Sequence, residues 1–170
     1  DLGYSTNLSA NEAATALARF ANIMGTSPAE YENMGSAIVD LGNNFATTES
    51  EIVDMSTELA GFTVQAGMSE ADTFALATAL SSVGIEAEAG STAMGTLTSN
   101  ITKAVVLGSG ELDQYAKAAG MSAQEFAAAW EMDSAGTLAA MIENLNGMQA
   151  AGVNILPILD DMGIKNARQV

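Results

Sequence analysis

The chain has no cysteine and no histidine among its 170 residues. Without cysteine it can form neither a disulfide nor a thiolate metal site. Without histidine it lacks the commonest general base and the commonest metal ligand, and a Ser-His catalytic triad is impossible. These two absences exclude several classes of enzyme and metalloprotein before any motif is considered.

Basic residues are scarce as well. Five Lys or Arg stand against 21 Asp or Glu, which gives a net charge of −16 at pH 7. A chain this acidic lacks the cations that neutralise phosphates, so we expect no direct nucleic-acid binding. Anionic lipid surfaces should repel it for the same reason.

Aromatic residues make up only 5% of the chain, although 48% of its residues are hydrophobic, ten of them Met. No apolar run approaches the roughly 18–20 residues that a membrane span needs. A composition rich in Ala and Met favours closely packed helices over a β-sandwich. We predict an all-α fold, a compact multi-helix bundle of helical hairpins with about eight to nine helices and no sheet.

Apolar residues recur at spacings of three and four, the period of an amphipathic helix. The clearest pair of helices is central: one would bury Ile52, Met55, Leu59 and Phe62, and the next Leu76, Leu80 and Val83. Gly42 should end the helix before this pair. The predicted helices span 11–24, 28–41, 49–66, 70–83, 87–107, 112–119, 123–131 and 137–151, and another begins near 155.

The turns share one pattern: Gly, one residue, Ser, two residues, then an acid. It begins at Gly25, Gly67 and Gly120. A glycine in the left-handed conformation ends a helix, and the Ser with the acid three residues later forms a capping box that starts the next. Thr48 with Glu51 is a further box, and Gly84 a further stop. The recurrence indicates either an internal duplication or the shared turn chemistry of helical hairpins.

Glycines also indicate the domain organisation. Gly108-Ser109-Gly110 is the strongest internal break, so we predict a helical bundle over 1–107 and a second helical subdomain over 108–170, packed on the first or starting a further repeat. Gly90 and Gly95 lie inside a predicted helix, where they favour a close helix crossing. The chain begins with Asp1 and not with Met, so we expect it to be a piece of a longer protein.

Candidate chemistry is sparse. Close acid pairs can hydrolyse glycosidic bonds, but most of those in this chain fall at predicted helix starts, where acids favour the helix dipole. Residues 90–95 have two glycines at phosphate-loop spacing, but Thr96 follows where the Lys should be. We therefore expect no enzyme activity, no catalytic residue, no cofactor and no metal. The acid pairs are Glu30/Glu32, Glu49/Glu51, Glu86/Glu88 and Asp160/Asp161.

Phe126 and Trp130, the single tryptophan, are four residues apart and share one helix face. Such a pair either packs in a core or forms an exposed anchor for a partner. We note both residues as a candidate partner contact and leave the two readings open.

Two unusual strings lie in the central part of the chain: residues 41–49 read LGNNFATTE and residues 82–90 read SVGIEAEAG. Both closely resemble the core of bacteriophage tail tape measure proteins. The resemblance extends over about residues 5–164 and is sharpest between 41 and 101. The residues that carry it or shape the turns around it are Gly42, Asn43, Asn44, Phe45, Thr48, Glu51, Gly67, Ser69, Gly84, Ile85 and Gly90.

The resemblance implies a mostly helical virion protein held in the tail, in the tube lumen or at the tip, and present in the host cytoplasm during assembly. Such a protein sets tail length, templates tube polymerisation and takes part in DNA ejection. Its implied partners are the tail tube protein, the tail assembly chaperones and the tail tip proteins, and self-association is open. The family core carries no catalytic residues, and an acidic filling would not trap DNA in the lumen.

Two alternative functions stay open at this point. One is a peptidoglycan-cleaving module, motivated by the acid pairs. The other is a helical bundle that docks assembly chaperones or the tube protein through exposed Met and Phe side chains.

Overall fold

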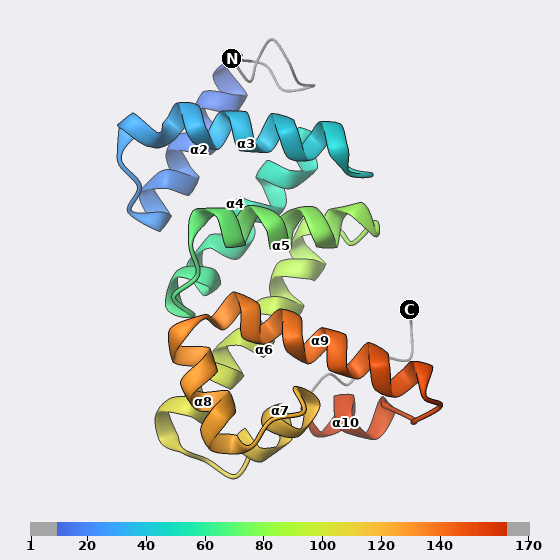
Figure 1. Cartoon of the computed structure of the whole chain (residues 1–170). Helices are drawn as coiled ribbons and strands as arrows, with labels where there is room; N and C mark the ends of the chain where they lie inside the picture. The colour runs from blue at the N-terminus through green and yellow to red at the C-terminus, as the bar shows by residue number, and fades with distance from the viewer. Residues whose placement is uncertain (1–9, 163–170) are drawn as a thin grey trace. The chain divides into compact units, whose positions relative to one another are not determined.

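The computed structural model describes residues 10–162 of the chain (Figure 1). Over this range the chain forms nine α-helices and one short 3-10 helix, with no strand, as the sequence predicts. The chain divides into two compact units, one of residues 1–95 and one of residues 96–170. The division lies inside a helix, after Gly95, and not at Gly108–Gly110, where the glycines favoured a boundary.

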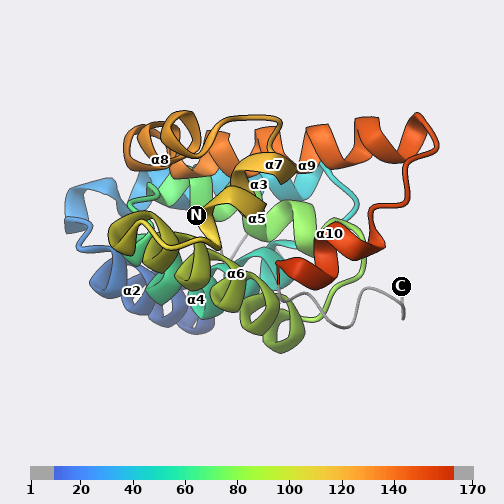
Figure 2. The ribbon, with the colours of Figure 1, turned by 90° about the horizontal axis from the view of Figure 1, so that it is seen from below.

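Unit 1 contains two helical hairpins and the start of a fifth helix. Figures 1 and 2 show its helices in two layers, with α3 and α5 in one and α2 and α4 in the other. The described elements are α2 (Ala10–Met24), the 3-10 helix η1 (Pro28–Glu30), α3 (Tyr31–Asn44), α4 (Glu49–Gln65), α5 (Glu70–Ser82) and the first part of α6 (Ala87–Leu107).

The core of unit 1 is built around α4. Ile52, Met55 and Leu59 are at most 1% exposed, which confirms the predicted face of this helix. Phe20 of α2 stacks on Phe74 of α5, with ring centroids 4.7 Å apart. Because α4 packs against α2, α3 and α5, it is the helix on which the unit depends.

The predicted face of α5 is wrong. Val83 is 72% exposed, and Leu76 and Leu80 are only partly buried at the edge of the core. The residues that α5 buries are Thr73, Phe74, Ala77, Thr78 and Ser81. Small and hydroxyl-bearing residues let α5 approach α4 closely. Their hydroxyls donate to carbonyl oxygens of the same helix, so burying them leaves no hydroxyl without a hydrogen-bond partner.

The turns follow the predicted chemistry. Gly25, Gly67, Gly84 and Gly120 all have φ between 70° and 77°. Thr48, Ser69 and Ser122 cap α4, α5 and α8, each with the predicted acid three residues later. Left-handed glycines therefore mark these four turns, and capping boxes fix the starts of α4, α5 and α8.

Among the helix ends that differ from prediction, two differ by three residues for a clear physical reason. Gly42 does not end α3, which continues to Asn44, and Gly42 instead leaves room for Glu49, since a Cβ there would lie 2.8 Å from the Glu49 side chain. Helix α9 begins at Ser134, three residues early, because the carboxylate of Asp133 accepts a hydrogen bond from Gly136 N–H at 2.8 Å.

Unit 2 contains the rest of α6, then α7 (Leu112–Ala118), α8 (Ala123–Met132), α9 (Ser134–Ala150) and α10 (Leu156–Asp161). Its core is aromatic: the Phe126 ring lies between Tyr115 and Trp130, with centroids 6.5 and 6.2 Å away. Ile101, Leu138 and Met141 are buried too.

Candidate functional site

The two strings that carry the family resemblance come together at one end of unit 1. The Thr47 hydroxyl, from the first string, donates a hydrogen bond to the Ser81 hydroxyl oxygen, next to the second, at 2.7 Å. The end of α3 and the turn after α5 lie on the same side of the unit (Figures 1 and 2). We call this region, residues 42–54 and 81–90, the motif end.

Glycines of the strings serve as contact points. A Cβ at Gly90 would lie 2.9 Å from the Met55 side chain and 3.2 Å from Ile85. At Gly95 a Cβ would lie 2.6 Å from the Phe62 ring. A side chain of α4 therefore occupies the space beside each of these glycines of α6, which explains why the helix tolerates glycines that cost about 1 kcal/mol each relative to alanine. The predicted close crossing of helix backbones stays a prediction.

The first turn of α4 is held by a complete capping box. The Thr48 hydroxyl oxygen accepts from Glu51 N–H at 3.3 Å, and the Glu51 carboxylate accepts from Thr48 N–H at 2.8 Å. Hydrogen bonds from the Thr48 hydroxyl and N–H, with a further one from Thr47, lower the pKa of Glu51 below its ordinary value of 4.5. The carboxylate is therefore retained in its charged form at the helix N-terminus, where the dipole favours it.

We expect Glu51→Gln to reduce stability by roughly 0.5 kcal/mol at pH 7, since Gln keeps the box geometry but removes the charge. Because the folded pKa is the lower one, the charge contributes fully above pH 4.5, and its contribution is lost as the pH falls through the folded pKa. Urea unfolding of both chains at pH 7 and pH 3 checks this. A difference that does not shrink between pH 7 and pH 3 would contradict the assignment.

A small cavity opens at the motif end, with a volume of about 190 Å³. It combines carboxylates with apolar groups from α4 and from the turn between α5 and α6. The lining residues are Glu51, Asp54, Met55, Ser81, Gly84, Ile85, Glu86 and Ala87.

Apolar side chains are exposed in the two turns of the motif end. Phe45 is 55% exposed, Val83 72% and Ile85 38%. Phe45 lies two residues before Thr47 and Val83 two residues after Ser81, so both belong to the two turns that the Thr47–Ser81 hydrogen bond joins. Helical periodicity did not reveal this cluster, because Phe45 lies in a loop and Val83 was assigned to the core.

The remaining predicted motif residues have local roles. Gly67 and Ser69 form the turn between α4 and α5, away from the motif end. The Asn44 side chain donates to the Asp40 carbonyl oxygen at 2.8 Å, and Asn43 is exposed.

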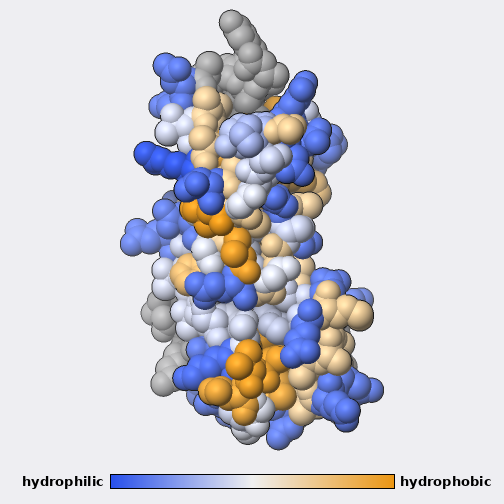
Figure 3. Space-filling view, turned by 90° about the vertical axis from the view of Figure 1, so that its left-hand side faces the viewer, coloured by the Kyte–Doolittle hydropathy of each residue, from blue (hydrophilic) through white to orange (hydrophobic). Residues whose placement is uncertain are grey.

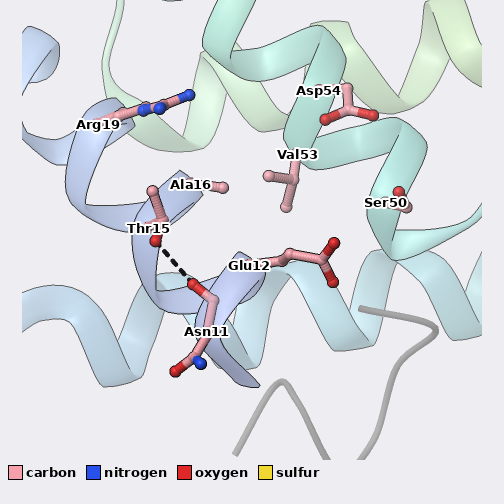
Figure 4. Close-up of a pocket in the computed structure, with 8 residues that line it drawn as sticks. All are labelled: Asn11, Glu12, Thr15, Ala16, Arg19, Ser50, Val53 and Asp54. Atoms are coloured by element: carbon pink, nitrogen blue, oxygen red, sulfur yellow. Dashed lines mark hydrogen bonds between the residues drawn. The ribbon is translucent and has the colours of Figure 1, made fainter. Parts of the chain in front are cut away.

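A second, wider groove lies between α2 and α4, with a volume of about 430 Å³ (Figure 4). Its floor includes Ala16 and Val53, and its rim is polar. Thr15 donates to the Asn11 carbonyl oxygen at 2.7 Å along one edge. The sequence analysis did not predict this groove, whose other lining residues are Glu12, Arg19, Ser50 and Asp54.

Phe126 and Trp130 lie in the core of unit 2, 0% and 4% exposed. Trp130 Nε1–H donates to the Thr102 hydroxyl oxygen at 3.3 Å, which satisfies its polar end. Burial favours the core interpretation of this pair over an exposed partner contact.

Two of the acidic pairs supply a capping acid, Glu30 for η1 and Glu51 for α4, whereas Asp160 and Asp161 end α10. Glu125, like Glu51, has its pKa lowered by hydrogen bonds from its capping serine, Ser122. A glycosidase's general acid needs the opposite, a raised pKa. In the part of the chain that the structure describes, no three acidic side chains are grouped as a metal site would require.

The surface has both hydrophobic and hydrophilic patches. Figure 3 shows one face on which hydrophobic residues gather in separate patches between hydrophilic ones. Outside the motif end, the most exposed large apolar side chains are Val106, Leu107 and Met132, 65–86% exposed. Among the helices between residues 10 and 162, none has the length and apolar character needed to cross a bilayer.

Comparison with known proteins gives one match. A family model described as "Phage-related minor tail protein" matches residues 2–156 of the chain. No curated protein and no solved structure matched the chain. The match covers all but the first residue of unit 1 and most of unit 2.

Proposed function

Because the chain belongs to the phage-related minor tail protein family, we propose that it is a structural module of a tail tape measure protein. A structural role in the virion tail and other tail proteins as partners follow from the family. The finer role that we propose is in tail length determination, tail tube assembly and DNA ejection, without enzyme activity.

One observation carries the proposal. The two strings that resemble the tape measure core begin 41 residues apart in the chain, yet the Thr47–Ser81 hydrogen bond joins the first to the residue before the second. Gly90 of the second string also contacts Met55 of α4, the helix that follows the first string. Both strings resemble the same family, and both lie on one surface of the fold. This arrangement supports a shared function for that surface.

The composition of unit 1 supports a module that can change its form. Much of the contact between α4 and α5 is made by hydroxyl and small side chains, such as Thr63 and Thr73, whose hydroxyls are 2.9 Å apart. Such a contact buries less apolar area than one made by Leu or Phe, and the hydrophobic free energy scales with that area. A hairpin of this kind is suited to open when the protein is fitted into a tube.

The test is an in-frame deletion of this segment from its parent gene, with tail length measured by electron microscopy. As one continuous helix, the 170 residues would span about 255 Å at 1.5 Å per residue. We expect tails shortened by about that length if the segment is extended in the tube. A smaller loss would mean that the segment stays partly folded while still contributing to length.

The matched control replaces residues 10–162 with an unrelated helical sequence of equal length. A ruler depends on length alone, so this replacement should restore full-length tails. Full-length tails that fail to infect after the deletion would remove the length role and leave ejection. Full-length, infectious tails after the deletion would overturn the proposal.

A further inference from the structure

The motif end exposes apolar side chains that unit 1 does not cover. Phe45 and Val83 are more than half exposed, and Ile85, which lines the cavity, is 38% exposed. These residues belong to two turns that are tied together by the Thr47–Ser81 hydrogen bond. The surface is therefore held in shape before any partner arrives, which lowers the entropic cost of binding.

Carboxylates are concentrated in the same part of unit 1. Glu51, Asp54 and Glu86 line the cavity, and Glu49 and Glu88 lie one turn or less away in the chain. Residues 20–102 contain eleven Asp or Glu and no Lys or Arg. Arg19 of α2, the one basic residue of unit 1, lines the groove that also contains Asp54. One cation cannot balance this many carboxylates, so a negative charge remains for another molecule to complement.

The negative charge of unit 1 also favours some binding partners of the motif end over others. Unit 1 contains thirteen acidic residues and one basic residue, a net charge of −12. A second copy of unit 1 would bring the same charge, and like charges brought together across an interface cost several kcal/mol. A positively charged segment gains both the electrostatic attraction and the apolar contact.

We infer that the motif end is a docking surface for a basic protein segment that carries an apolar side chain, supplied by another tail protein. The apolar side chain contacts Phe45, Val83 and Ile85, and the flanking Lys or Arg side chains face the carboxylates around the cavity. This inference does not depend on the proposed role in tail length, because it concerns the chemistry of the partner and not the extension of the segment.

The probe is a fluorescent 18-residue helical peptide of Leu and Lys, titrated with the full chain by fluorescence anisotropy. A matched peptide has Glu in place of every Lys. We expect only the Lys peptide to bind, with its affinity falling about tenfold or more between 50 and 500 mM salt as the charges are screened. Binding of both peptides, of neither, or without dependence on salt overturns the inference.

Variants locate the surface. Phe45→Ser with Val83→Ser should weaken binding of the Lys peptide about tenfold or more, because it removes the apolar contacts. The control, Val106→Ser with Leu107→Ser, removes two equally exposed apolar side chains in unit 2 and should change the affinity less than about twofold. Circular dichroism verifies that both double variants fold.

Two other outcomes overturn the inference. Equal weakening by both double variants would mean that the peptide binds exposed apolar groups without selectivity. A dimer of the chain in sedimentation, lost in the Phe45→Ser, Val83→Ser variant, would identify a second copy as the occupant. Neither outcome bears on tail length, so the proposed function is tested separately.

Discussion

Replacing Phe20 by alanine is expected to lower the free energy of unfolding of unit 1 by about 3–5 kcal/mol, the usual cost of removing a buried aromatic ring. Phe20 is 2% exposed and stacks on Phe74 at 4.7 Å, so the substitution leaves a cavity between α2 and α5. Because small domains are stable by only about 5–15 kcal/mol, much of the stability of unit 1 depends on this ring.

The measurement is urea unfolding of the full chain, followed by circular dichroism and by the fluorescence of Trp130, which reports on unit 2. We expect the dichroism transition to move to lower urea and the fluorescence transition to move less. Phe45→Ala is the control, since it removes the same ring from a site that is 55% exposed and should change stability much less. Two transitions that move equally would mean that the units unfold together.

Replacing Phe126 by alanine is the second change with a large expected effect, again about 3–5 kcal/mol. The ring is 0% exposed and lies between Tyr115 and Trp130, so its loss removes the centre of the aromatic core of unit 2. Here the fluorescence transition should move to lower urea, with a red-shifted Trp130 emission as water reaches the indole.

Met132→Ala is the matched control for this second change. Met132 ends the same helix, α8, and is 86% exposed, so its substitution should leave the transition within about 0.5 kcal/mol of the wild type. If Phe126→Ala left the fluorescence midpoint unchanged, Phe126 would not be a core residue, and its interpretation as a partner contact would return.

Helix positions were predictable because the signals for them are local. The capping boxes at Thr48, Ser69 and Ser122 and the left-handed glycines at Gly25, Gly67 and Gly120 lie within a few residues of the ends that they define. Where prediction missed, a longer-range contact decided. Gly42 reads as a helix stop, but in the fold it makes room for Glu49, and α3 continues past it.

The candidate site was predictable only in part. The strings at 41–49 and 82–90 attracted attention through their resemblance to a family, and the cap of Thr48 with Glu51 is readable from spacing alone. The contact between them through Thr47 and Ser81 could not be predicted from the sequence, because a hydrogen bond between residues 34 positions apart leaves no periodic pattern. The exposure of Val83 was missed for a related reason: its spacing from Leu80 fits a buried helix face.

The sequence by itself determined the all-α class, most helix bounds and the strong negative charge, since each depends on composition or on neighbours within one or two turns. Only the tertiary structure decided which face each helix buries. Helix α5 buries hydroxyl and small side chains because close approach to α4 and hydrogen bonds within the helix outweigh the burial of Leu76 and Val83. The same packing places Phe45 and Val83 outside the core, and so creates the motif end.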